Sequence, residues 1–159
     1  MRDVTGPSEP GPGERRLARP PSERYDRDEP APAPVAEGSV GRALGLGSLL
    51  AVGTAIAIVL LGGVAAITAG LLAVAAVGGW VTALAVRSGA GQSLSPRERI
   101  VTAVVLALVG IALGQLGLWV YGRYEGGVLG PLDYLAEVFG FLVPVQAGLA
   151  ALAAWLGAR

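Results

Sequence analysis

Four residue types are absent from this 159-residue chain: cysteine, histidine, lysine and asparagine. Without Cys or His, the chain cannot form a disulfide, a Cys or His metal site, or a Ser-His-Asp or Cys-His nucleophile. Without Lys, it has neither a Schiff-base nucleophile nor the lysine of a phosphate-binding P-loop. We therefore expect no enzyme activity, no metal and no cofactor.

Charge is also scarce, because 15% of the residues are charged and 53% are hydrophobic. A soluble domain has about a quarter of its residues charged, and the mean hydropathy here is +0.60. The formal net charge is zero, so electrostatics gives no reason to expect a nucleic-acid partner. All basic residues are arginine, and Ala, Gly, Arg and Pro are abundant, as GC-rich codons would produce. The composition indicates a membrane protein from a bacterium.

Residues 1–41 differ in composition from the rest of the chain. They hold most of the prolines and a mixture of arginines and acids, with few apolar residues. Such a segment cannot bury a core, so we predict a disordered Pro/Arg/acid-rich cytoplasmic tail. No apolar stretch closely follows the Arg15-Arg16 pair, so we do not expect a signal peptide.

Residues 42–159 predict an all-α integral membrane bundle of four transmembrane helices, arranged as two antiparallel hairpins. Residues 43–86 carry no charge. As one helix they would extend about 66 Å, twice the roughly 30 Å core of a bilayer. We therefore expect a tight turn at Gly62-Gly63. The four predicted spans cover 43–61, 64–86, 97–121 and 131–156.

Two of the helix starts carry local signals. The Ser-Pro-Arg-Glu motif at 95–98 is a capping box with proline at the first helical position. A Gly-Pro pair at 130–131 opens the fourth helix, with Asp133 in the first turn, where the helix dipole favours a negative charge. Pro144 predicts a kink near Gln146 in this helix.

The placement of arginine predicts the orientation in the membrane. With four spans, the tail, Arg42, the 87–99 loop and Arg159 lie on one side, and Arg123 lies on the other. We therefore expect a protein of the bacterial plasma membrane with both termini in the cytoplasm.

Glu137 is the one ionisable side chain that we expect to enter the bilayer. Asp133 shares its helix face, Gln115 reaches a similar depth on the third helix, and Arg123 is the basic residue on that side. Ionisable groups inside a membrane favour a functional interpretation, so we predict an outer-leaflet polar site for an ion or ligand. The alternative is that these residues lie at the headgroup level without a function. The length of the 131–156 segment favours this alternative.

A small-residue face on the third helix, formed by Gly110, Gly114 and Gly117, predicts close helix packing. It could form a dimer interface or pack inside the bundle, and we favour the second interpretation.

Two classes of function remain. We expect a non-enzymatic accessory or structural component that acts through helix contacts and its cytoplasmic tail. Its partners would be the lipid bilayer and either another membrane protein or a second copy of the chain. The alternative is a small transport or permeation component that uses the polar site around Glu137.

Overall fold

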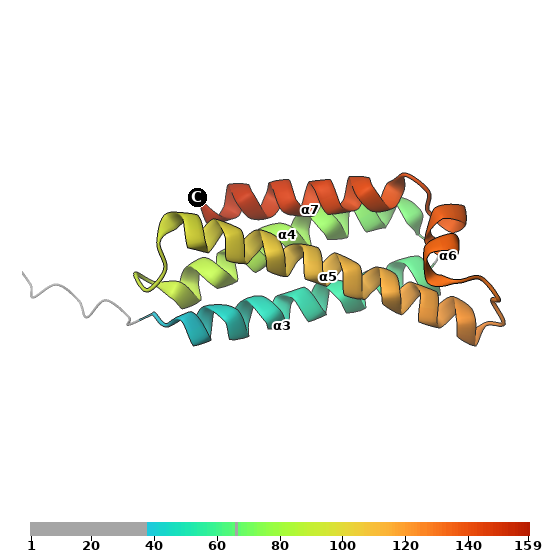
Figure 1. Cartoon of the computed structure of the whole chain (residues 1–159), viewed down its shortest axis with the longest axis horizontal. Helices are drawn as coiled ribbons and strands as arrows, with labels where there is room; N and C mark the ends of the chain where they lie inside the picture. Colours follow the sequence, from blue (N-terminus) through green and yellow to red (C-terminus); the bar gives the residue numbers. More distant parts are fainter. Residues whose placement is uncertain (1–37, 66) are drawn as a thin grey trace, which may run out of the picture. The chain divides into compact units, whose positions relative to one another are not determined.

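A computed structural model describes residues 38–65 and 67–159, which form a bundle of helices (Figure 1). The expected tail lies outside the described residues up to position 37. The elements are α3 (Val40–Val59), a π-helical turn η1 (Leu60–Val64), α4 (Thr68–Ala90), α5 (Pro96–Tyr124), α6 (Pro131–Val138) and α7 (Leu142–Ala158). The fold is therefore an all-α bundle, as the composition predicts.

The helix starts at one end of the bundle are capped by side chains. Ser39 caps α3, because its hydroxyl accepts from the Arg42 amide at 3.1 Å, so the helix begins inside the expected tail. The capping box of α5 is confirmed. The Ser95 amide donates to the Glu98 carboxylate at 2.9 Å, and the Glu98 amide donates to the Ser95 hydroxyl at 3.3 Å. These bonds satisfy amides that otherwise have no partner within the helix.

The Gly62-Gly63 pair lies within the π-helical turn, which continues α3 to Val64, and α4 begins at Thr68. The predicted tight turn at these two glycines is therefore wrong, because both are helical. The glycines have a packing role, because a Cβ at Gly62 would lie 3.1 Å from Leu118. A Cβ at Gly63 would lie 3.0 Å from the Tyr121 ring. Small residues let this end of α3 approach α5.

Many of the buried residues are small, and many of the large apolar residues are exposed, which is unusual for a soluble protein. The buried core is rich in alanine, including Ala75, Ala83, Ala107, Ala150 and Ala154. Large apolar side chains point outward from the four long helices, and examples are Leu49, Ile56, Val77, Leu116 and Leu152. Water would penalise such a surface, whereas lipid would not, and small residues are typical of helix contacts in membranes. Among the described residues, three helices are long and apolar enough to cross a bilayer, and there are four such spans if α6 and α7 together count as one.

The helices α3 and α7 each pack against both α4 and α5, which also contact each other (Figure 1). Glycines permit the closest approaches. A Cβ at Gly79 of α4 would lie 2.3 Å from the Ala150 carbonyl oxygen of α7, and one at Gly110 of α5 would lie 2.9 Å from the Ala51 carbonyl oxygen of α3. Backbones that meet this closely leave no room for a side chain.

The expected continuous helix over 131–156 is broken in the structure. The helices α6 and α7 meet at 91° across Phe139–Phe141, and Gly140 there has φ of +51°, a left-handed conformation that favours glycine. The bend expected near Gln146 therefore lies earlier, at Phe139–Phe141, and α7 begins at Leu142, before Pro144. Proline fits this first turn because its missing amide would have no helical partner there.

Candidate functional site

The charged residues of the predicted polar site lie at the surface. Asp133 and Glu137 of α6 are exposed, as is Arg123 in the last turn of α5. Asp133 occupies the first turn of α6, where the helix dipole stabilises its charge. These three charged groups are therefore exposed at the end of the bundle where α5 ends and α6 begins.

Gln115, the fourth predicted site residue, is not part of that surface. Its side chain is 3% exposed and donates a hydrogen bond from Nε2 to Oε1 of Gln146, which is fully buried. The sequence places Gln115 at a depth similar to that of Glu137, but its partner in the structure is Gln146. The pair joins α5 to α7 inside a core whose other buried polar residues are Thr54 and Thr82, and it lies roughly 13 Å along α5 from the helix end at Tyr124.

The glutamine pair leaves two polar atoms without partners. Gln115 Oε1 and Gln146 Nε2 are both buried and have no hydrogen bond within the described part of the chain. One hydrogen bond between two primary amides always leaves one acceptor and one NH₂ group free. Buried amide atoms without partners carry a desolvation penalty of about 1–3 kcal/mol each.

Gln115 also lines a cavity of about 350 Å³ between α5, α6 and α7. The other lining residues are apolar: Leu108, Ile111, Ala112, Leu116, Trp119, Pro131, Leu135, Val143 and Ala147. The break between α6 and α7 turns α6 across this cavity, so Pro131 and Leu135 can contribute to its wall. Trp119 fixes the loop before α6 by donating from its indole to the Leu129 carbonyl at 3.1 Å.

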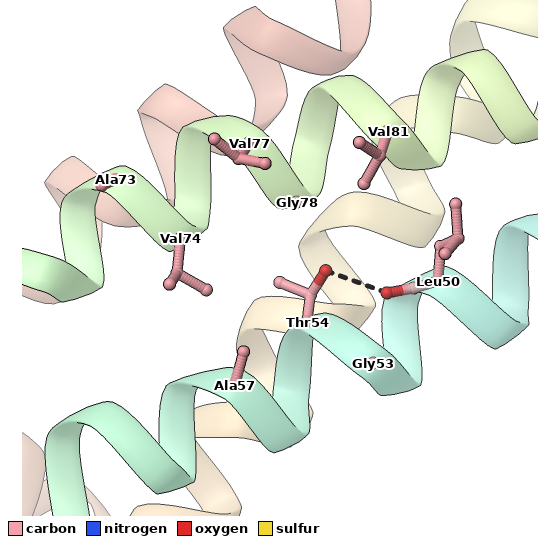
Figure 2. Close-up of a pocket in the computed structure, with 9 residues that line it drawn as sticks. All are labelled: Leu50, Gly53, Thr54, Ala57, Ala73, Val74, Val77, Gly78 and Val81. Carbon is pink, nitrogen blue, oxygen red and sulfur yellow. Dashed lines mark hydrogen bonds between the residues drawn. The ribbon is translucent and has the colours of Figure 1, made fainter. Parts of the chain in front are cut away.

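Figure 2 shows a second hollow, of about 360 Å³, between α3 and α4. It exists because small residues, including Gly53, Ala57 and Gly78, face one another across the two helices. Its hydroxyl group, that of Thr54, donates to the Leu50 carbonyl of its own helix at 2.9 Å. This hollow is therefore an apolar groove whose polar group is already satisfied.

The glycines of the predicted small-residue face lie against α3 of the same chain. A Cβ at Gly114 would lie 2.7 Å from Ile58, and one at Gly117 would lie 2.6 Å from Val59. Together with Gly110 against Ala51, they form a contact inside the bundle. This arrangement corresponds to the packing interpretation and leaves no room there for a second copy.

Arg99 closes the loop between α4 and α5. Its guanidinium donates to the carbonyls of Gly91 at 3.2 Å and Leu94 at 3.5 Å. Arg159, at the same end of the bundle, lies over the Trp155 ring, 3.1 Å from its centroid. The Arg99 guanidinium is thus held by backbone carbonyls, and the Arg159 guanidinium is held by an aromatic ring.

Within the described ranges, no group of three or more His, Cys, Asp or Glu side chains could hold a metal ion. Comparison with models of protein families, with curated proteins and with solved structures finds no match to this chain.

Proposed function

We propose that the chain is a non-enzymatic component of the bacterial plasma membrane that acts through helix contacts and its N-terminal segment. The observation that carries this proposal is the distribution of side chains in the bundle. Small residues form the contacts, large apolar residues cover the outside, and the ionisable residues are confined to the two ends. A bundle of this kind offers surfaces for lipid and other helices, and the buried side chains of its described residues include no acid or base.

The orientation follows from the charges at those two ends. The end formed by the start of α3, the α4–α5 loop and the last residue of α7 carries Arg42, Arg87, Arg97, Arg99 and Arg159 (Figure 1). The opposite end carries Arg123. Because arginine is retained on the cytoplasmic side, the first end faces the cytoplasm, and residues 1–37 precede α3 in the chain. The Pro/Arg/acid-rich composition of that segment suits contact with a partner rather than a folded core.

The experiment compares the full chain with a variant that lacks residues 2–37 and with a matched control in which the same residues are scrambled. Each is crosslinked in native membranes, and the crosslinked proteins are identified. We expect specific neighbours with the full chain that are lost in both variants. Identical neighbours in all three preparations would contradict a role for the N-terminal segment.

A small transport or permeation component is the second candidate. Discontinuous helices line the binding sites of many transporters, and the break between α6 and α7 lies beside the buried Gln115. Flux of small polar solutes into proteoliposomes tests this candidate. Flux that falls on Glu137→Gln would support the outer-leaflet polar site, and no flux with the full chain would exclude transport of the solutes tested.

A further inference from the structure

We propose that the groove between α3 and α4 binds one anionic phospholipid, whose acyl chain lies in the groove and whose phosphate group is bound by Arg42. This inference goes beyond the proposed function, because it assigns a ligand to a surface of the bundle. It rests on three observations: the apolar wall of the groove, the position of Arg42 in line with that wall, and the restriction of charge to one end of the groove. The assignment of the lipid to the cytoplasmic leaflet rests on the proposed orientation.

The wall of the groove suits a hydrocarbon chain. Small residues of both helices, among them Gly53 and Gly78, leave a hollow of about 360 Å³ (Figure 2). This volume lies within the range of small-molecule sites, roughly 300–1,000 Å³. The Thr54 hydroxyl already donates to the Leu50 carbonyl at 2.9 Å, and the other lining residues have no polar side chain. The groove therefore favours a hydrocarbon over a polar group, which would lose its hydration there.

Polar side chains continue both walls of the groove toward the cytoplasmic end. Arg42 precedes Gly53 on α3 by 11 residues, and Ser88 follows Val77 on α4 by the same number. Eleven residues make about three turns of an α-helix, so each polar residue lies on the same helix face as the groove residue. A Cβ at Gly89 would lie 2.9 Å from the carbonyl carbon of Arg42, so the two helices meet at this end. Arg42 and Ser88, which are both exposed, therefore lie at one mouth of the groove.

The distance from this mouth to the groove matches the depth of one leaflet. Arg42 precedes Leu50, which lines the groove, by eight residues, or about 12 Å along the helix axis. On α4, Ser88 lies seven residues, or about 11 Å, beyond Val81. The acyl chains of one leaflet extend about 15 Å, half of the roughly 30 Å hydrocarbon core. A lipid with its phosphate level with Arg42 would therefore place the end of an acyl chain inside the groove.

Charge determines which headgroup is preferred. The Arg42 guanidinium can bind a phosphate through two parallel hydrogen bonds, and Arg87 adds a second positive charge at this end of α4. Among the described residues at this end, Glu98 is the one acid, and its carboxylate is already engaged in the capping box of α5. The other end of the groove is uncharged, because residues 43–86 carry no charge. Basic sites at the cytoplasmic ends of membrane helices bind anionic headgroups, so a lipid with a net negative charge is the ligand.

The test is native mass spectrometry of the purified full chain in detergent micelles. The chain is mixed with equal amounts of palmitoyl-oleoyl phosphatidylglycerol and of phosphatidylcholine with the same acyl chains, and the complexes with one lipid are compared. We expect phosphatidylglycerol to be preferred by about fivefold, which corresponds to the about 1 kcal/mol of one arginine near a charged lipid surface. Equal binding of the two lipids would overturn the proposal. Because micelles have no leaflets, that result would leave the proposed orientation and the role of the N-terminal segment untouched.

A pair of arginine variants tests the headgroup site. Arg42→Gln should remove most of the preference for phosphatidylglycerol, because it removes the guanidinium in line with the groove. Arg97→Gln is the matched control, since Arg97 is exposed at the same end of the bundle but belongs to α5 and does not line the groove. This control should keep the preference. Equal losses in the two variants would mean that net charge alone attracts the lipid, and would overturn the proposal.

A pair of glycine variants tests the groove. A Cβ at Gly53 has nothing within 4 Å, so the side chain of Gly53→Leu can occupy the groove without displacing the protein. This variant should lower the binding of both lipids several-fold. Gly148→Leu, at an equally open position on α7, should leave the binding unchanged, and circular dichroism checks that the helices remain. Unchanged binding in Gly53→Leu would overturn the proposal, and the two arginine variants still decide it if Gly53→Leu fails to fold.

Discussion

The contact between Gly79 and Ala150 predicts a large effect from the smallest substitution. In Gly79→Ala, the added Cβ would lie 2.3 Å from the Ala150 carbonyl oxygen and 3.0 Å from its carbonyl carbon. Both atoms belong to backbone, so no rotamer change can relieve the overlap. The helices α4 and α7 would have to separate by about 1 Å, which forfeits a quarter to a half of the dispersion energy of each affected contact. Overpacking of this kind destabilises by about 1–3 kcal/mol.

The assay is reversible unfolding in mixed detergent micelles, followed by far-ultraviolet circular dichroism. Gly148→Ala is the matched control, because Gly148 lies in the same α4–α7 half of the bundle but has nothing within 4 Å of its Cβ position. It should be neutral or slightly stabilising, since alanine favours a helix over glycine by about 1 kcal/mol. We expect the free energy of unfolding of Gly79→Ala to fall by about 2 kcal/mol relative to this control. Equal stability of the two variants would refute the close approach of α4 and α7.

Three further outcomes follow from the structure. Ser95→Ala should lower the free energy of unfolding by about 1 kcal/mol, because it removes the cap of α5, and an unchanged melting curve would mean that water or headgroups satisfy those amides. Gln115→Leu and Gln146→Leu should couple in a double-mutant cycle by about 0.5 kcal/mol or more, whereas additive effects would contradict their hydrogen bond. Glu137→Gln should change the free energy of unfolding by less than about 0.5 kcal/mol, because substitutions of exposed side chains usually have small effects. A larger change would require a partner for Glu137 that the described part of the structure does not contain.

The sequence predicted the features that depend on local chemistry. The absence of charge over 43–86 predicts membrane helices, and the capping box at 95–98 needs only four adjacent residues, so neither depends on the rest of the fold. The Gly62-Gly63 turn was placed wrongly because glycine can serve either a turn or a close contact. The choice between these roles depends on where Leu118 and Tyr121 lie in space relative to the two glycines. The sequence alone does not show this.

The glutamine pair was missed because the break in the fourth helix was missed. In a continuous helix from Pro131, Gln146 lies about 22 Å from the start, near the middle of the bilayer. In the structure α7 begins at Leu142, which puts Gln146 about 6 Å from the helix start and level with Gln115. Gly140 has a left-handed backbone conformation, so the chain turns there and a new helix starts, which changes the depth of Gln146 along its helix. Pro144 predicted a bend in this helix, but it did not show that the helix is interrupted at Gly140, four residues earlier, and turns by 91°.

The absence of cysteine makes the topology directly measurable. Single cysteines are introduced as Gln92→Cys in the α4–α5 loop, as Val128→Cys in the α5–α6 loop, where Val128 is 85% exposed, and after Arg159. Each is treated with a membrane-impermeant maleimide in intact and in lysed cells. The account predicts that the cysteine at 128 is labelled in intact cells and that the other two are labelled only after lysis. Labelling of the cysteine after Arg159 in intact cells would contradict the central claim that α6 and α7 form one broken span.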